Sequence, residues 1–517
     1  MRIAQWVSSE DHESGPSGWW VYFGLFAVCG LVWMLANPLM TGPDELFQAR
    51  RAAAVARGEF TGEEGPQAPL LVEVQAPEAY LTGDEVARCF YGEPVPNAPV
   101  DPISLFRSSC PKFQGGDTLV AVSTGQYRGQ PFYYWLAGLP TLLSPGALGA
   151  YAMRAVGVAL SAALLASAAV SVGRSASPTL AGLGLLGAVA PGVLYLAAST
   201  NPSSVEIAAA LSAWATGALL VQPRSDIGAR EVARFGVAMV VLVAVRGLGP
   251  LFGASVVVAL GVVAGPQRSR QLIGRRDVQA WAAATALATL ASIAWLRMIQ
   301  DQFPLPSRPG SGLATAVSYL PWYLHQSVGV FGQNDSAVPA QAAWLYVLVV
   351  AGVAAVGLAR SPTRTAAVAA ATLLAGIALS LTAEGLSLPP IGFFWQGRYA
   401  LPLLLGGVVL ATCRARPRST TASDDPVAPW DTADLLARPE TGRFVVRATL
   451  LVMVVVHGVA FVSAARHHAA KGGGPQAILS ALTAPRWAPP VPFWILLIVY
   501  LAALVGVARR LTARTGD

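Results

Sequence analysis

Residues 37–60 read "NPLMTGPDELFQARRAAAVARGEF" and mark the end of the first long apolar run of the chain, residues 19–40. A helix needs about 17–25 apolar residues to cross the hydrocarbon core of a bilayer, so this run predicts a membrane span. The run is too long for the apolar part of a signal peptide, and no small-residue cleavage site follows it, so we predict that the span is not cleaved. The Asn-Pro and Gly-Pro pairs then end the helix, and charged residues begin.

Composition places the whole chain in the membrane class. Of its 517 residues, 54% are hydrophobic and 12% are charged, and a soluble domain carries about twice that charged fraction. The net charge of +7 does not indicate nucleic-acid binding, because the arginines gather in short segments between apolar runs. Lys112 and Lys471 are the only lysines, and with the abundant Ala, Gly and Val this is typical of a GC-rich genome, such as that of an actinobacterium.

Apolar runs recur along the sequence and predict an all-α polytopic membrane protein with about twelve transmembrane helices. The short runs 233–246 and 249–265, on either side of "RGLGP", are also compatible with one broken helical hairpin. The predicted spans are 19–40, 151–172, 178–199, 204–222, 233–246, 249–265, 279–297, 342–358, 365–383, 399–412, 444–463 and 493–508.

Arginine clusters predict the orientation, because cytoplasmic loops of membrane proteins carry an excess of positive charge. Alternate loops are rich in arginine, and an even number of spans then places both termini in the cytoplasm of a plasma (inner) membrane protein. The acidic residues Glu10, Asp11 and Glu13 do not support this orientation, but the later loops outweigh them. The arginine-rich loops contain Arg174, Arg224, Arg230, Arg234, Arg268, Arg270, Arg275, Arg276, Arg360, Arg364, Arg414, Arg416, Arg418, Arg509, Arg510 and Arg514.

This orientation divides the chain into five parts and places a long loop outside the cell. Within that loop, "QPFYYWLAGLP" at 130–140 predicts an aromatic-anchored helix at the membrane interface. The parts are a cytoplasmic tail 1–18, a transmembrane core 19–412 with an extracytoplasmic loop 41–130, a cytoplasmic loop 413–443, a C-terminal transmembrane pair 444–508 and a cytoplasmic tail 509–517.

Asp44 and Glu45 are the first candidate functional residues. One interpretation is structural, in which Asp44 caps the following helix and Glu45 complements its dipole. The other is catalytic, in which a carboxylate at the membrane surface acts as a general base. Neighbouring carboxylates on a helix point about 100° apart, so we expect one base and one positioning group rather than a pair that shares a proton.

"LYLAASTNPSSVEIAAAL" at 194–211 ends one span and starts another. Asn201 or Ser203 is predicted to cap the new helix, with Glu206 in its first turn as in a capping box. Glu206 is nevertheless costly at a membrane edge unless it is paired or hydrated, so Asn201 and Glu206 are also candidates for substrate binding.

Arg246 and Arg398 each stand almost alone among apolar residues at the predicted outer face. One interpretation is that both extend to lipid phosphates. The other is that together they bind the phosphate of a ligand, which a guanidinium group can hold through two hydrogen bonds.

"PWYLHQSVGVFGQNDSAVP" at 321–339 combines aromatic and polar side chains. His325, Asn334 and Asp335 could hydrogen-bond a sugar, although aromatic residues also suit a membrane interface and Asp335 also suits a turn. Adjacent His467 and His468 lack the spacing of zinc ligands, so we predict no metal site.

Cys89 and Cys110 both lie in the predicted outer loop, where an oxidising environment would allow a disulfide. Their separation in sequence does not establish the distance between them, so the bond is a candidate only.

Four motifs together resemble a known family. "NPLMTGPDE", "STNPSSVEIAA", "VGVFGQNDSAVP" and "WQGRYALPLL" resemble, in that order, the recurring motifs of a bacterial membrane family called domain of unknown function 2142. The resemblance covers residues 37–405, with a looser match at "RWAPP" (486–490). The tract "FGQND" departs from the family pattern, which tends to carry an aromatic and an aliphatic residue before the Asp.

The family is similar to GT-C glycosyltransferases, and the resemblance implies a GT-C-like bundle that moves a sugar from a polyprenyl-phosphate donor, usually with inversion. Asp44 then looks like the catalytic base with Glu45 as helper, and Arg398 and Arg246 look like ligands of the donor phosphate. Gln396 and Tyr399 are further substrate-binding candidates. The lineage implies arabinofuranose as one possible sugar and an extracytoplasmic glycan, lipoglycan or glycoprotein of the cell wall as acceptor.

Two other functions remain open on the sequence, a transporter or flippase of a lipid-linked glycan and a non-catalytic membrane scaffold. A transporter needs polar residues at mid-membrane, whereas these spans are almost purely Ala, Val, Leu and Gly. No nucleotide-binding motif is present. The sequence requires no cofactor, and nothing in it supports a divalent cation.

Overall fold

The computed structural model describes residues 16–65, 70–90, 110–222, 227–303, 312–414, 439–469, 485 and 487–512. Most of the predicted tails, most of the loop 413–443, and Arg486 of "RWAPP" lie outside the described residues.

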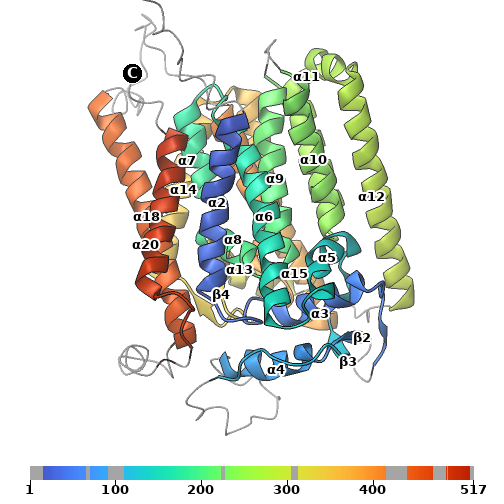
Figure 1. Ribbon diagram of the computed structural model, residues 1–517. Coiled ribbons are helices and arrows are strands. Elements are labelled where there is room, and N and C mark those ends of the chain that lie inside the picture. Colours follow the sequence, from blue (N-terminus) through green and yellow to red (C-terminus); the bar gives the residue numbers. More distant parts are fainter. Residues whose placement is uncertain are drawn as a thin grey trace, which may run out of the picture.

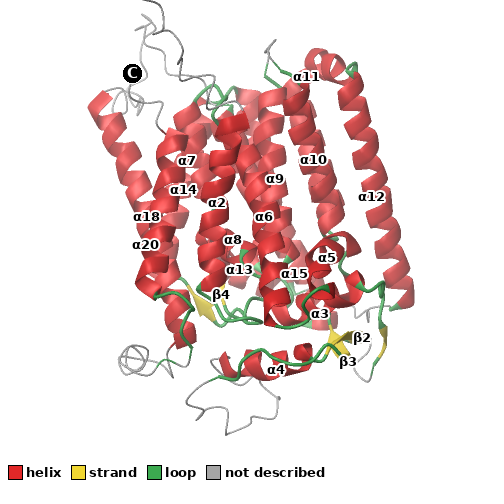
Figure 2. Cartoon of the chain, viewed as in Figure 1, coloured by secondary structure: helices red, strands yellow, loops and turns green. Residues whose placement is uncertain are grey.

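Long helices lie side by side as a bundle, with a small sheet and short helices beneath one end (Figures 1 and 2). Among the described residues, nine helices are long and apolar enough to cross a membrane, or ten if the pair α7 and α8, bent by 61°, is one span. The main helices of the bundle are α2 (Pro16–Leu35), α6 (Ala147–Val172), α7 (Pro178–Ala188), α8 (Pro191–Ala197), α9 (Pro202–Leu220), α10 (Ala229–Val245), α11 (Gly249–Ile273), α12 (Arg276–Gln302), α14 (Ala340–Arg360), α15 (Thr363–Ile391), α16 (Leu401–Cys413), α18 (Pro439–Ala469) and α20 (Phe493–Thr512).

Each predicted span corresponds to one of these helices or to the bent pair, but several boundaries differ. The runs 233–246 and 249–265 form two separate helices, and α11 continues past a kink at Gly265 and Pro266 to Ile273. Helix α15 extends to Ile391, eight residues beyond the predicted span 365–383.

Helix α9 is the centre of the bundle, because all of its residues are buried. Small and polar side chains let its neighbours approach closely. The hydroxyls of Ser171 on α6 and Thr216 on α9 lie 2.9 Å apart. Trp214 Nε1 donates to the Pro402 carbonyl of α16 at 2.9 Å.

The end of the bundle that carries the sheet is called the sheet end, and the opposite end, where α2 begins and α20 ends, is called the termini end (Figure 1). The sheet is antiparallel in the order β1-β2-β3, and β2 pairs with β3 from Val72–Thr124 to Pro77–Leu119. The elements at this end are α3 (Glu45–Ala56), β1 (Glu63–Glu64), β2 (Val72–Pro77), α4 (Ala79–Phe90), β3 (Leu119–Thr124), η2 (Gln126–Arg128), α5 (Pro131–Gly138), η3 (Leu139–Leu142), α13 (Leu313–Val328), β4 (Val330–Phe331), β5 (Ser336–Ala337) and η4 (Gly397–Ala400).

A buried arginine of α3 and a disulfide connect this layer. Arg50 donates to the carbonyls of Tyr80 at 2.8 Å and Ser123 at 3.0 Å, and its guanidinium lies 2.6 Å from the Asp84 carboxylate. Cys89 at the end of α4 is bonded to Cys110, with Cα atoms 5.6 Å apart. The layer thus has its own polar and covalent links in addition to its contacts with the bundle.

Candidate functional site

Asp44 stands at the N-cap position of α3 but does not cap the helix. Its backbone is left-handed, with φ of 57°, and its side chain makes no capping hydrogen bond. The structural interpretation of Asp44 is therefore wrong, because this backbone conformation turns the carboxylate away from the free N–H groups of α3. Asp and Asn are among the few residues other than Gly that adopt this conformation readily. The carboxylate Oδ2 instead lies 2.9 Å from Nη2 of Arg398.

Glu45 has different surroundings, although it is the next residue. Its two carboxylate oxygens lie 2.6 and 2.7 Å from Nε and Nη2 of Arg154 on α6, and each side chain of this pair is 1% exposed. Oε2 also accepts from the Gly42 N–H at 3.0 Å, and Oε1 accepts from the Thr200 N–H at 3.0 Å. Glu45 is thus saturated with hydrogen bonds, and this geometry favours a role in positioning rather than in proton transfer.

Arg154 extends the same connection to the end of the first span. It donates to the carbonyls of Met34 at 3.2 Å, Asn37 at 2.9 Å and Pro38 at 2.5 Å. Met34 lies in the last turn of α2 and the other two residues follow that helix, where a helix leaves its carbonyl acceptors unpaired. One buried guanidinium therefore fixes both the end of α2 and the start of α3, and with them the position of Asp44.

The hairpin formed by β4 and β5, which is distant in sequence, packs against the Asp44 turn. The Asp44 N–H donates to Gln333 Oε1 at 3.2 Å, and Gln333 Nε2 donates to the Gly42 carbonyl at 2.8 Å. The Gly332 N–H donates to the Tyr195 hydroxyl at 2.9 Å. Asn334, in the same turn, accepts from Nη1 of Arg398 at 3.4 Å.

Arg398 is held by a loop that α13 and α15 support. The Gly397 N–H donates to Gln326 Oε1 of α13 at 2.8 Å, and the Trp395 N–H donates to Glu384 Oε2 of α15 at 2.6 Å. A Cβ atom at Gly397 would lie 2.0 Å from the Tyr323 carbonyl oxygen, so only glycine fits there. The side chain of Arg398 is 8% exposed and that of Asp44 is 29% exposed, so solvent or a ligand reaches the pair from the Asp44 side.

Arg246 completes a cluster of two guanidinium groups around one aromatic ring. Its Cζ lies 4.6 Å from the centroid of the Tyr399 ring, and Cζ of Arg398 lies 5.1 Å from the same centroid. Arg246 Nη1 also lies 2.5 Å from Ser203 Oγ and 3.6 Å from Glu206 Oε2. The two lone arginines of the sequence therefore meet at Tyr399, at the depth where α10 ends and α11 begins.

Asn201 caps α9 as predicted, since its Oδ1 accepts from the Ser203 N–H at 2.9 Å. Its Nδ2 also donates to the Pro43 carbonyl at 2.8 Å, which brings α9 against the Asp44 turn. The predicted capping box is wrong, because Glu206 lies beyond the first turn of α9 and is used to pair with Arg246.

Arg51 is a further buried cation that sequence reasoning missed. It is fully buried, and its guanidinium nitrogens have no hydrogen-bond partner among the described residues. Its Cζ lies 5.8 Å from the ring centroid of Tyr134 and 5.7 Å from that of Trp295, as in a cation–π arrangement. Burial lowers the pKa of Arg51 to about 10, so the group remains charged at neutral pH and adds positive potential next to the site.

The remaining candidates lie around this cluster rather than in it. His325 Nε2 is 2.7 Å from the Val338 carbonyl. Asp335 accepts from the Gln333 N–H at 2.9 Å and lies 3.1 Å from His467. Gln396 borders a small cavity together with Arg398 and Asn334. Within the described residues, no group of three or more His, Cys, Asp and Glu is placed to hold a metal ion.

The contact between Glu384 and the Arg398 loop leads to a prediction. Glu384→Ala leaves the Trp395 N–H without its acceptor, and a buried unpaired N–H costs about 1–3 kcal/mol. We expect hydrogen exchange in residues 394–398, followed by mass spectrometry, to become at least about tenfold faster. Glu384→Gln keeps an oxygen at the same place and serves as the control, with exchange near that of the native protein. Unchanged exchange in Glu384→Ala would show that α15 does not hold this loop.

The geometry on its own brings two guanidinium groups and a carboxylate together, an arrangement suited chemically to an anion next to a proton acceptor. A partly exposed carboxylate lies next to two guanidinium groups, at the edge of an apolar bundle. A phosphate that bound Arg398 and Arg246 would compete with Asp44 for Arg398 and release the carboxylate.

The sequence matches the family described as "Predicted membrane protein (DUF2142)" over residues 26–406. The chain belongs to the DUF2142 family. The DUF2142 match includes Asp44, Arg246 and Arg398, whereas α18 and α20 lie beyond it. Family membership and the long apolar helices agree that this is a multi-pass membrane protein.

Two solved structures are similar to this DUF2142 chain. One is ArnT from Cupriavidus metallidurans in the apo state, with 16% identity, a TM-score of 0.40, and coverage of 96% of this chain and 78% of that chain. The other is the same protein bound to undecaprenyl phosphate, with 15% identity, a TM-score of 0.40, and coverage of 97% and 78%. None of the curated proteins compared with the chain matches it in sequence.

Proposed function

We propose that this DUF2142 protein is a GT-C type membrane glycosyltransferase. It moves a sugar from a polyprenyl-phosphate donor to an extracytoplasmic glycan, lipoglycan or glycoprotein, with inversion at the anomeric carbon. The site then faces the outside of the plasma membrane, and both termini face the cytoplasm. Arabinofuranose is the sugar that we would test first, because of the lineage that the composition indicates.

One observation supports this proposal above the others, namely the pair of Asp44 with Arg398. The two residues are 354 positions apart, yet their side chains meet at 2.9 Å, with Arg246 on the other side of Tyr399. A base next to a phosphate-binding group is what sugar transfer from a phosphate donor requires, because one partner loses a proton while the other leaves as an anion.

The reaction follows from these positions as a single displacement. Asp44 accepts the proton of an acceptor hydroxyl while that oxygen forms a bond to the anomeric carbon of the donor. The bond from this carbon to the phosphate oxygen breaks, and its electron pair leaves with the polyprenyl phosphate. Arg398 and Arg246 stabilise the negative charge that develops on the leaving phosphate.

The donor class fits the depth of the site. A polyprenyl phosphate keeps its chain in the bilayer, so its phosphate lies at the level where helices end. Arg246 stands directly after α10, and Arg398 stands directly before α16. The sugar is already activated by its phosphate, so the reaction needs no nucleotide and no resident cofactor.

A transporter of a lipid-linked glycan is the alternative. Such a protein needs polar groups along a path through the membrane. A large cavity among the described residues lies between α10, α11 and α12 and is lined almost entirely by apolar side chains. This lining does not suit the passage of a sugar, so the enzyme is favoured.

A transfer assay tests the proposal. Purified protein is incubated with synthetic polyprenyl-phosphate sugars and an acceptor glycan, and the product is identified by mass spectrometry. We expect a glycosidic product from at least one donor, arabinofuranose being the first. The same protein in vesicles with radiolabelled lipid-linked glycan provides the comparison. Lipid that crosses the vesicle membrane without formation of a glycosidic product would favour the transporter instead.

A further inference from the structure

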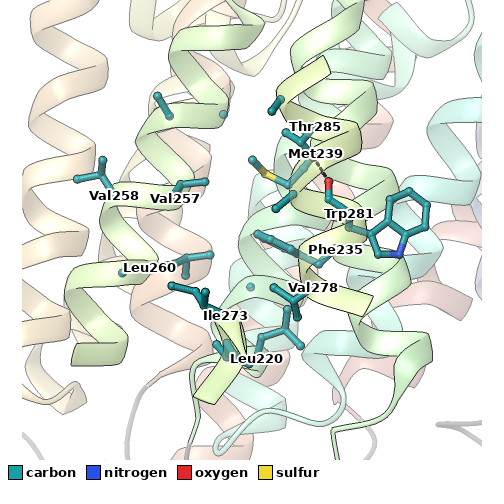
Figure 3. A pocket seen from close by; sticks show the side chains of 18 of the residues that line it. Leu220, Phe235, Met239, Val257, Val258, Leu260, Ile273, Val278, Trp281 and Thr285 are labelled. Carbon is teal, nitrogen blue, oxygen red and sulfur yellow. Dashed lines mark hydrogen bonds between the residues drawn. The ribbon is translucent and has the colours of Figure 1, made fainter. Parts of the chain in front are cut away.

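A large cavity of the described structure is a slot between α11 on one side and α10 and α12 on the other. Its volume is about 710 Å³, within the roughly 300–1,000 Å³ of ligand sites in proteins. Figure 3 shows Val257, Val258 and Leu260 on one wall and Phe235, Met239 and Trp281 on the other. Val257 and Val258 are largely exposed on the surface of the bundle. The slot is therefore open sideways to the lipid.

The lining of the slot is apolar except for a few residues, among them Ser269, Thr285 and Thr289. Two of these polar residues, Thr285 and Thr289, do not offer a free hydroxyl to a ligand. The hydroxyls of Thr285 and Thr289 donate to carbonyls of their own helix, at 2.8 Å each. Figure 3 shows the first of these bonds, from Thr285 to the Trp281 carbonyl. Its occupant must consequently be a hydrocarbon chain rather than a glycan.

The depth of the slot distinguishes between kinds of hydrocarbon chain. Its lining extends from Pro250, in the first turn of α11, to Leu220 and Ile273 at the termini end of α9 and α11. The stretch from Pro250 to Ala264 alone rises roughly 21 Å at 1.5 Å per residue. The hydrocarbon core of a bilayer is about 30 Å thick, so an acyl chain of one leaflet reaches only about 15 Å. The slot therefore passes the middle of the membrane, and an acyl chain of one leaflet would not fill it.

The sheet end of the slot lies next to the cation cluster. Pro250 is four residues after Arg246, and only the turn 246–248 separates α10 from α11. A Cβ atom at Gly247 would lie 3.4 Å from the Leu296 side chain. This turn therefore also packs against α12, just beyond the part of that helix that lines the slot. A ligand with its chain in the slot would thus have its head group at Arg246.

We infer that the slot binds the single polyisoprenyl chain of a long-chain lipid phosphate, with its far end past the midplane near Ala282 and Ile273. This inference rests on the proposed function for the identity of the head group. It adds a requirement on chain length, because only a chain longer than one leaflet fills both halves of the slot. A phosphate lipid of a few isoprene units binds through its head group but leaves the inner half empty.

Photo-crosslinking tests the inference without need of sugar transfer. The probes are polyprenyl monophosphates of six and of three isoprene units, each with a diazirine at the far end of the chain, and the full-length protein is held in nanodiscs. We expect the long probe to label α12 around 278–282 and the short probe to label α11 around 250–257. Long-probe label outside the slot would overturn the inference. A diazirine phosphatidylglycerol that labels the slot and is not displaced by the long phosphate would also overturn it.

A matched pair of variants on α12 gives the affinity test. Ala282 lines the slot, and its neighbour Ala283 does not, although both are exposed. We expect Ala282→Phe to weaken binding of the long phosphate about tenfold, the factor that corresponds to 1.4 kcal/mol. Binding of the short phosphate should be unchanged, and Ala283→Phe should bind both as the native protein does. Equal loss for both chain lengths, or no loss in Ala282→Phe, contradicts the slot.

The two proposals fail in different ways. If no donor sugar is transferred but the long phosphate still binds and labels α12, the slot stands and the glycosyltransferase does not. If transfer occurs and the Ala282→Phe variant is as active with long as with short donors, the glycosyltransferase stands and the slot does not.

Discussion

We expect Asp44→Asn to lower the rate of the proposed sugar transfer by about 100- to 10,000-fold, the usual contribution of a general base. The amide cannot accept the acceptor proton, but it has nearly the same shape, and asparagine tolerates the left-handed backbone. Arg398 keeps its contact with Asn334 and its position over Tyr399, so we expect donor binding to remain close to native. Initial rates with a synthetic polyprenyl-phosphate sugar, together with equilibrium binding of that donor, measure both effects.

Asp301→Asn is the matched control for this experiment. Asp301 is exposed near the end of α12, and its replacement should leave the rate within about twofold of native, as surface substitutions usually do. Full activity in both Asp44→Asn and Asp44→Ala would remove Asp44 from the reaction. A loss of donor binding that parallels the loss of rate would instead assign Asp44 to holding Arg398.

Glu45→Gln has its largest effect on folding stability rather than on chemistry. The change removes the negative charge that balances the buried Arg154. Loss of one partner of a buried ion pair lowers the free energy of unfolding by about 3–5 kcal/mol. The same change loosens the end of α2 and the Asp44 turn, because Arg154 connects them. Unfolding of purified protein followed in detergent should shift to clearly lower temperature.

The double variant Glu45→Gln/Arg154→Gln separates the two interpretations of Glu45. Removal of both charges leaves no uncompensated ion, so we expect it to recover part of the stability lost in Glu45→Gln. A Glu45→Gln protein with native stability and greatly reduced transfer would show that Glu45 is a catalytic group after all.

The sequence predicted the positions of the helices well, because each carries its own apolar run. It predicted about twelve membrane spans, however, whereas nine or ten among the described residues are long and apolar enough to cross a membrane. The capping role of Asn201 was also visible, since capping is local and depends on the few residues that follow. Helix ends were less certain. The predicted sixth span ends at residue 265, before Pro266, yet the chain continues as a helix past that kink to Ile273.

The candidate site shows a different limit. Sequence motifs drew attention to Asp44, Glu45, Arg246 and Arg398, but their partners depend on contacts between distant segments. Nothing in the local sequence indicates that Glu45 faces Arg154 or that Glu206 faces Arg246. Arg51 was overlooked because it lies in an amphipathic segment with Arg50, and only the packing of α3 on Tyr134 and Trp295 distinguishes the two.

The different partners of Asp44 and Glu45 have a consequence for biosynthesis. Chains emerge from the ribosome N-terminus first, at about 5–20 residues per second. Glu45 can find Arg154 once the first spans have been inserted, but Asp44 must wait for Arg398, which is made on the order of tens of seconds later. The framework of the site is therefore set early in translation, and the Asp44–Arg398 pair is assembled only after most of the chain has entered the membrane. A nascent or truncated product that lacks residue 398 would carry the folded Asp44 turn without the partner that controls it.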